Sequence, residues 1–134
     1  MPVQRINGAD LYYESAGAGM PALFIHGMCG NANVWDGQVR RLSGLLRCVT
    51  YDRRGHTRST LGEVGREDVL RTVELHADDA AELVQALDLA PCLLVASSGG
   101  LTQHAQGGMD LLVDRFNRGI HIQGAPGHSR LDHL

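Results

Sequence analysis

Apolar residues recur with two different periods along this chain, and these periods predict strands and helices in alternation. Val3–Ile6 and Asp10–Glu14 alternate around Asn7-Gly8, a dipeptide typical of two-residue hairpin turns. Largely apolar runs then predict buried strands at 22–26, 48–51 and 93–95. Apolar residues at helical spacing predict one helix after a cap at 31–33, continuing to 46, and a longer helix over roughly 66–87. A hairpin followed by strand–helix repeats predicts an α/β fold, with a mainly parallel sheet and helices on both faces.

The pattern is weaker after Gly100. A helix is expected over 101–117, although Gly107-Gly108 interrupts it at a cost of about 1 kcal/mol per glycine relative to alanine. One more strand is predicted over 119–124, and polar residues without periodicity follow it. We expect residues 1–134 to form a single domain.

Composition narrows the class of protein. A net charge of −3 gives no electrostatic reason to expect nucleic acid or an anionic membrane as a partner. No apolar run approaches the length of a transmembrane helix, and the N-terminus lacks a basic region followed by an apolar one. Cys29, Cys48 and Cys92 are widely spaced, which predicts free thiols in a reducing compartment, the cytoplasm.

The third apolar run stops abruptly at Ser97-Ser98-Gly99-Gly100. With Ala96 before it, this stretch reads small-x-Ser-x-Gly, a strand-to-helix turn that exposes one serine at the end of a sheet. Ser98 is then the candidate nucleophile, because choosing Ser97 would put Val95 where a small residue is needed. The alternative is an ordinary glycine-rich loop after a core strand. His26 and Asp52 follow the other two buried strands, so we expect both at the sheet edge where Ser98 lies.

Three stretches together resemble the α/β-hydrolase fold family. Residues 24–30 resemble its HGxxG loop, residues 51–59 its D-x-R-G-x-G-x-S stretch, and residues 96–100 its nucleophile elbow, with Ala96 in place of the usual first glycine. The resemblance covers residues 1 to about 127.

The resemblance implies roles for individual residues. The backbone N–H groups of Met28 and Gly99 would form an oxyanion hole for a reaction at Ser98. Asp52 and Arg53 would brace loops. Four residues would form the substrate-binding set: His26, Gly27, Trp35 and Ser97. His26 would also orient the oxyanion loop. Trp35 would either line the pocket or anchor its helix to the sheet.

The sequence departs from the family after its sixth strand. Ordinary members continue through two further strands and usually a lid, which carry the triad acid and histidine. We therefore expect a truncated core, ending after about the sixth strand. Asp132 as acid with His128 or His133 as base could replace the missing groups, and His104 is another candidate base. The alternative is that these side chains are solvated residues of a frayed C-terminus.

These observations favour a hydrolase that cleaves an activated ester of a small molecule through Ser98, with no cofactor. A second hypothesis is a zinc-like, metal-dependent phosphoester or phosphotriester hydrolase, although neither H-x-H nor H-E-x-x-H is present. Its ligands would come from His26, His56, His128, Asp132 and His133. A third hypothesis is an inactive fragment or binding module.

A homodimer is also expected. The last predicted strand would leave an exposed edge at 120–122, which lacks a charged residue to discourage pairing. Two chains could pair there or swap the region after Gly100. Either arrangement could bring His121 or His128 of one chain near Ser98 of the other.

Overall fold

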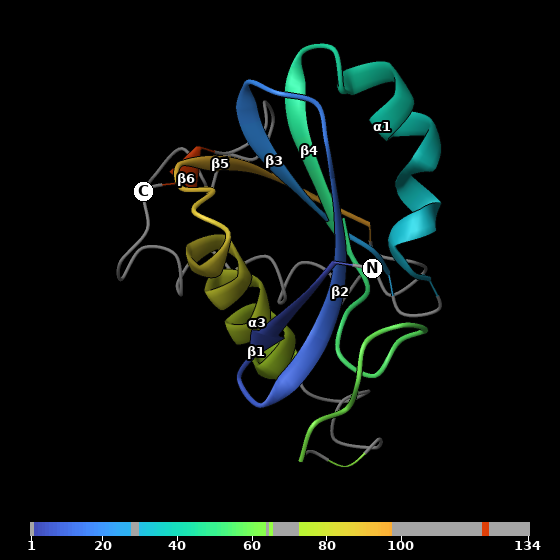
Figure 1. Ribbon diagram of the computed structural model, residues 1–134, viewed down its shortest axis with the longest axis vertical. Coiled ribbons are helices and arrows are strands. Elements are labelled where there is room, and N and C mark those ends of the chain that lie inside the picture. The colour runs from blue at the N-terminus through green and yellow to red at the C-terminus, as the bar shows by residue number, and fades with distance from the viewer. Residues whose placement is uncertain (1, 28–29, 64, 66–72, 98–121, 124–134) are drawn as a thin grey trace.

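A six-stranded sheet forms the centre of the molecule. The computed structural model describes residues 2–27, 30–63, 65, 73–97 and 122–123. The strands follow the order β1-β2-β4-β3-β5-β6 (Figure 1). Their bounds are β1 Val3–Ile6, β2 Ala9–Ala16, β3 Met20–Ile25, β4 Leu46–Tyr51, β5 Cys92–Ala96 and β6 Ile122–Gln123. The described helices are η1 Ala32–Trp35, α1 Asp36–Leu42 and α3 Val73–Ala86.

The N-terminal hairpin forms as its sequence predicts. β1 and β2 pair antiparallel, and Ile6 lies opposite Ala9 across a two-residue turn. Asn7 and Gly8 both have positive φ, 48° and 83°, which is the backbone that asparagine–glycine turns favour. β2 then continues along β4, so the hairpin becomes one side of the main sheet.

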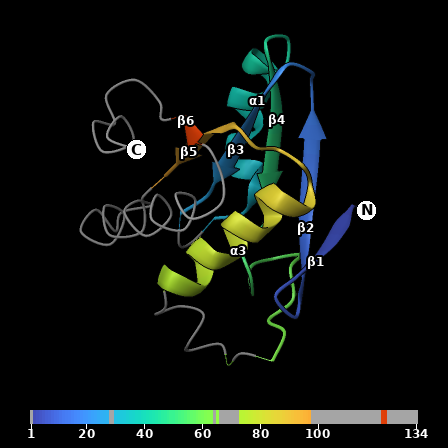
Figure 2. The same ribbon diagram turned by 90° about the vertical axis from the view of Figure 1, so that its left-hand side faces the viewer.

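Parallel pairing dominates the other side. β3 pairs parallel with both β4 and β5, and β5 pairs parallel with β6. α1 and α3 lie on opposite faces of the sheet (Figures 1 and 2). The α/β class with helices on both faces, predicted from periodicity, is therefore confirmed.

Each face of the sheet has its own apolar core. On one face α3 packs against the sheet through its fully buried residues Ala77, Ala80, Leu83 and Val84. On the other face η1 and α1 cover the sheet with a smaller cluster around Trp35. The ring of Trp35 packs against that of Phe24 on β3, with centroids 5.3 Å apart.

The first predicted helix is shorter than its periodicity suggested. α1 ends at Leu42, Leu45 is 76% exposed, and Leu46 already pairs with Met20 as the first residue of β4. The turn between them packs tightly on Gly17, where a Cβ would lie 2.3 Å from the carbonyl oxygen of Ser43. Strand pairing therefore takes Leu46 out of the helix that its spacing favoured.

The second helix agrees with its prediction over the part that the structure describes, Val73–Ala86. The last predicted strand is present as Ile122–Gln123, paired with β5. The predicted helix over 101–117 lies outside the described residues. Among the helices that are described, none is long and apolar enough to cross a membrane.

Candidate active site

The carboxyl ends of β3, β4 and β5 meet at one edge of the sheet. In the parallel register Ile25 lies opposite Ala96, and the backbone N–H of Ser97 donates to the carbonyl of Ile25 at 3.1 Å. His26, Asp52 and Ser97 are the first residues beyond these three strands. The sheet therefore brings together the strand ends from which the predicted site residues continue.

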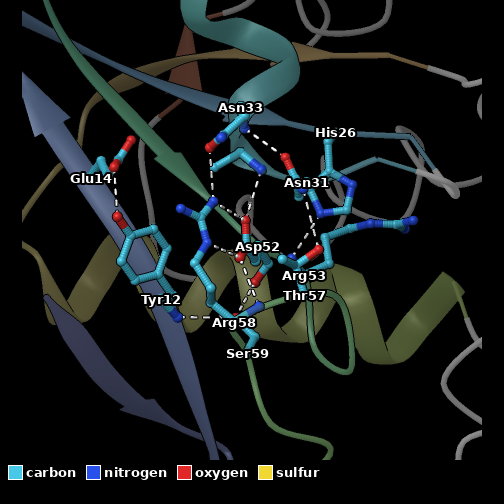
Figure 3. Close-up of polar contacts among 11 residues, drawn as sticks. Tyr12, Glu14, His26, Asn31, Asn33, Asp52, Arg53, Thr57, Arg58 and Ser59 are labelled. Carbon is cyan, nitrogen blue, oxygen red and sulfur yellow. Dashed lines mark hydrogen bonds and ion pairs between the residues drawn. The ribbon is translucent and has the colours of Figure 1, made fainter. Parts of the chain in front are cut away.

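His26 lies within this edge, only 1% exposed, and both of its ring nitrogens form hydrogen bonds, of which Figure 3 shows the one with Arg53. Its Nδ1 lies 2.6 Å from the carbonyl oxygen of Gly27, which requires a proton on Nδ1. Its Nε2 accepts the backbone N–H of Arg53 at 2.9 Å. Burial lowers the pKa of His26 to about 4. A neutral ring with no free lone pair serves neither as a general base nor as a metal ligand. His26 therefore holds its own loop and the start of the loop after β4 in place.

Asp52 is the buried acceptor at the centre of the site. Its Oδ1 accepts the backbone N–H of Ala32 at 2.8 Å, and its Oδ2 accepts the backbone N–H of Arg58 at 3.0 Å. The Arg58 guanidinium binds both carboxylate oxygens, Nε at 2.8 Å and Nη2 at 3.0 Å (Figure 3). Burial favours the neutral acid, but the Arg58 contacts and the Ala32 N–H outweigh it and lower the pKa of Asp52. Asp52 is thus held as a carboxylate that ties two loops together.

Arg58 extends this network to two further elements. Its Nη2 donates to Asn33 Oδ1 at 2.9 Å, and its guanidinium lies 4.0 Å above the Tyr12 ring of β2. Ser59 beside it donates to the Asp52 carbonyl at 2.6 Å and accepts the Tyr12 N–H at 2.9 Å. The loop after β4 is therefore fixed to β2 and to η1 at the same time.

The same network holds the loop after β3 on both sides of its two undescribed residues. Before them, the carbonyl oxygen of Gly27 accepts the hydrogen bond from His26 Nδ1. After them, Asn31 caps η1 by accepting the Asn33 N–H at 2.9 Å, and its Nδ2 donates to Thr57 Oγ1 at 3.3 Å. The predicted oxyanion loop is thus anchored at its entry and at its exit.

Thr57 adopts a left-handed backbone, with φ +41°. A β-branched residue rarely takes this conformation because its side chain crowds the following carbonyl. In the D-x-R-G-x-G-x-S stretch that residues 52–59 resemble, this position is a glycine. The loop therefore contains a strained residue directly beside the site.

A second arginine–aspartate pair lies deeper, and sequence reasoning missed it. Arg54 and Asp79 are each 1% exposed and bind through two contacts of 2.9 Å. Arg54 also donates to the carbonyls of Ile6 and Asn7, so it joins the hairpin, the β4 loop and α3. The available signal was Asp79 itself, a charged residue on the apolar stripe of a helix, one turn from Leu83.

The remaining predicted residues divide into two groups. Trp35 is 8% exposed and packs into the core under η1, and Ser97 is exposed at the end of β5. The binding roles of His26, Gly27, Trp35 and Ser97 stay predictions. The other predicted residues lie outside the described part of the chain: Met28, Ser98, Gly99, His104, His121, His128, Asp132 and His133.

The described residues contain no group of three or more histidine, cysteine or acidic side chains placed to hold a metal ion. His56 packs edge-on against His26, with ring centroids 4.9 Å apart, and its Nδ1 lies 3.1 Å from the carbonyl oxygen of Arg54. Of the five ligands that the metal hypothesis proposed, His26 and His56 are thus neighbours, but His26 has no lone pair to give.

Comparison with known proteins agrees with this geometry. A family model described as alpha/beta hydrolase fold matches residues 21–106. An uncharacterized hydrolase of Bacillus subtilis, YraK, is 34% identical over 118 residues, which are 88% of this chain and 41% of YraK. The chain belongs to the α/β-hydrolase fold family, as its motifs predicted.

Solved structures show the same likeness. Est816, an N-acyl homoserine lactone degrading enzyme, is 25% identical with a TM-score of 0.68, over 88% of this chain and 40% of Est816. An epoxide hydrolase from Bacillus megaterium shares the fold with a TM-score of 0.73 at 24% identity, over 92% of this chain and 42% of that one. The chain spans about two fifths of the length of each of these three proteins.

Proposed function

We propose that this chain carries the nucleophile of a hydrolase that cleaves an activated ester of a small molecule. The observation that carries the proposal is the hydrogen bond from the Ser97 N–H to the Ile25 carbonyl, which joins the ends of β5 and β3. Ser98 follows Ser97 directly, and Met28 is two residues beyond the braced His26. At about 3.8 Å between consecutive Cα atoms, the chain can separate Ser98 from Ser97 by no more than about 4 Å and Met28 from His26 by no more than about 8 Å.

The chemistry follows from these positions. The Ser98 hydroxyl attacks the ester carbonyl, and the N–H groups of Met28 and Gly99 donate to the oxyanion that forms. Removing one such donor in other enzymes costs about 3–4 kcal/mol of transition-state stabilisation. The leaving alcohol departs, and water then hydrolyses the acyl-serine.

The proton on Ser98 needs a base other than His26, whose nitrogens are both committed. His128 or His133, with Asp132 behind it, or His104, can take this role. The name of Est816 supports an ester substrate, because a lactone is a cyclic ester. We therefore place esters and lactones ahead of the epoxides that the Bacillus megaterium enzyme is named for.

Covalent labelling tests the nucleophile directly. A fluorophosphonate probe phosphonylates an activated serine, and peptide mass spectrometry locates the adduct. We expect stoichiometric labelling at Ser98, and hydrolysis of p-nitrophenyl butyrate that Ser98→Ala abolishes. Ser15→Ala, an exposed serine on β2, is the matched control and should keep both. Label at Ser97, or activity that survives Ser98→Ala but is lost on chelation, would contradict the proposal, and the second result would favour the metal-dependent hydrolase.

We also propose a homodimer through β6. Within the described residues, β6 pairs only with β5 and forms one edge of the sheet. Such an edge offers unpaired N–H and C=O groups to a second chain. Sedimentation equilibrium should show a dimer at micromolar concentrations, and a monomer throughout that range would count against it.

A reducing, cytoplasmic location is proposed on the state of two cysteines. Cys48 and Cys92 are both buried and free. Burial raises the pKa of Cys92 to about 11, so its thiol stays protonated and unreactive. Thiol titration of the freshly isolated native protein from cells should find both reduced, whereas a disulfide at either would contradict the location.

A further inference from the structure

Three arginines lie within the first seven residues after β4, and two of them have an acidic partner among the described residues. Arg54 binds Asp79 and Arg58 binds Asp52, each through two contacts of 2.8–3.0 Å. Arg53 forms no ion pair with any residue of the described chain. Within the described part of the chain, carboxylates therefore neutralise the two arginines that tie loops together and leave Arg53 without a counter-ion.

Among the described residues around Arg53, none takes the place of a carboxylate partner. Its side chain is half-buried, and its Nε is enclosed with no acceptor among the described residues. Tyr51 is the neighbour whose charge would favour the Arg53 cation. Burial of the Tyr51 hydroxyl, however, raises its pKa far above neutral, so Tyr51 carries no charge. A partly desolvated guanidinium therefore lacks a counter-ion in the described structure, an arrangement that favours binding of an anion.

Arg53 is also at the site. Its backbone N–H is fixed by His26 Nε2 at 2.9 Å. Its side chain runs beside His26 and extends away from the Asp52–Arg58 network (Figure 3). Its charge is close enough to help lower the pKa of His26. The cation thus borders the edge from which the predicted oxyanion loop and Ser98 continue.

We infer that Arg53 binds a carboxylate of the substrate, so that the substrates of this site are anionic esters or lactones, such as monoesters of dicarboxylic acids. A planar guanidinium matches a carboxylate through two parallel hydrogen bonds, which a lysine ammonium cannot reproduce. The inference rests on the proposed function for the location of the ester, while the anion site itself is a property of Arg53.

A pair of unreactive ligands tests the anion site without catalysis. N-phenylsuccinamic acid carries a carboxylate, and N-phenylbutanamide is its neutral match of similar size. Calorimetric titration of the full chain should give about 10- to 100-fold tighter binding of the acid, as for other charge-assisted contacts. Arg53→Gln should abolish this preference, and Arg53→Lys should retain only part of it. Arg40→Gln removes an exposed charge on α1 and should leave the preference intact.

The outcomes separate the two proposals. Equal binding of the two ligands by the unaltered chain, or a preference that survives Arg53→Gln, overturns the anion site. Where Arg53→Gln does not fold, judged by circular dichroism, Arg53→Lys decides, and an unchanged preference overturns the inference. If Ser98 resists the fluorophosphonate while the preference depends on Arg53, the proposed function fails and the anion site stands. If both proposals hold, Arg53→Gln should lower kcat/KM for mono-p-nitrophenyl succinate about 10-fold or more and leave kcat/KM for p-nitrophenyl butyrate unchanged.

Discussion

Two arginines in the loop after β4 each bind a buried aspartate, Arg54 with Asp79 of α3 and Arg58 with Asp52, and the two pairs have different roles. Arg54–Asp79 is closed off from solvent on both sides, with both side chains 1% exposed. Arg58–Asp52 buries its aspartate completely but leaves 25% of the arginine exposed. The first pair joins the N-terminal hairpin to α3. The second joins the loops that surround the predicted site.

The difference shows that an arginine–aspartate pair can stabilise either the fold or the predicted site, depending on which other residues each partner contacts. Arg54 binds backbone carbonyls of the hairpin, which takes no part in the predicted chemistry. Asp52 binds the Ala32 N–H at the exit of the loop that contains Met28. Breaking the first pair should therefore affect stability alone, whereas breaking the second should lower activity as well as stability.

The largest effect is expected for Asp79→Asn. It leaves the Arg54 charge buried without its partner, and such losses cost about 3–5 kcal/mol of unfolding free energy. Urea denaturation followed by circular dichroism would measure the loss. Asp10→Asn is the matched control, because Asp10 pairs with Arg5 at the surface and an exposed pair contributes at most about 1 kcal/mol. Equal losses for the two variants would mean that burial does not distinguish these pairs.

The next effect is a loss of stability at low pH, caused by His26. Its pKa is about 4 in the folded protein, against about 6.5 in an unfolded chain. Between pH 6.5 and pH 4, the imidazole of His26 is therefore mostly protonated in the unfolded state and mostly neutral in the folded state. Stability should be full above pH 6.5 and fall by about 3 kcal/mol as the pH drops to 4. Urea midpoints measured across this window should flatten in His26→Asn, which cannot titrate, and an unchanged slope would contradict the assignment.

Much of this arrangement is readable from local pattern. Asn7-Gly8 defines the hairpin, because few other residues accept positive φ at both turn positions. The apolar runs define β3, β4 and β5, and parallel strands must bring their carboxyl ends to one edge. His26 and Asp52 could therefore be placed at that edge before any coordinates were known.

The ion pairs could not be read in the same way. Asp79 lies 25 residues beyond Arg54, and nothing in local spacing states which arginine it meets. Arg53, Arg54 and Arg58 carry the same side chain, but their partners depend on how the loop after β4 turns across β2 and η1. The helix end at Leu42 was also misjudged, since strand pairing at Leu46 is a tertiary preference that overrides helical spacing.

Arg58→Met would test whether the second pair holds the site. Asp52 keeps two backbone donors, so the expected stability loss is only about 1–3 kcal/mol. Given the proposed function, kcat on p-nitrophenyl butyrate should fall about 10-fold with little change in KM, because the oxyanion loop loses its anchor. Arg58→Lys should recover part of kcat, and Arg40→Met should change neither value. A stability loss with kcat unchanged would assign this pair to the fold alone.

The smallest effect on stability is expected at Thr57, which lies between Arg54 and Arg58 in the sequence. Its left-handed backbone costs about 1–2 kcal/mol for a residue with a side chain, and glycine removes that cost at an entropic penalty of about 0.5–1 kcal/mol. Thr57→Gly should therefore raise the unfolding free energy by up to about 1 kcal/mol. Thr57→Ala is the matched control, because it keeps the strain and loses only the bond from Asn31, so it should not stabilise. Stabilisation by alanine as large as by glycine would mean that the hydroxyl, rather than the backbone, is the unfavourable feature. If Thr57→Gly instead lowers kcat while raising stability, the strain in this loop belongs to the site, as the strained residues of many active sites do.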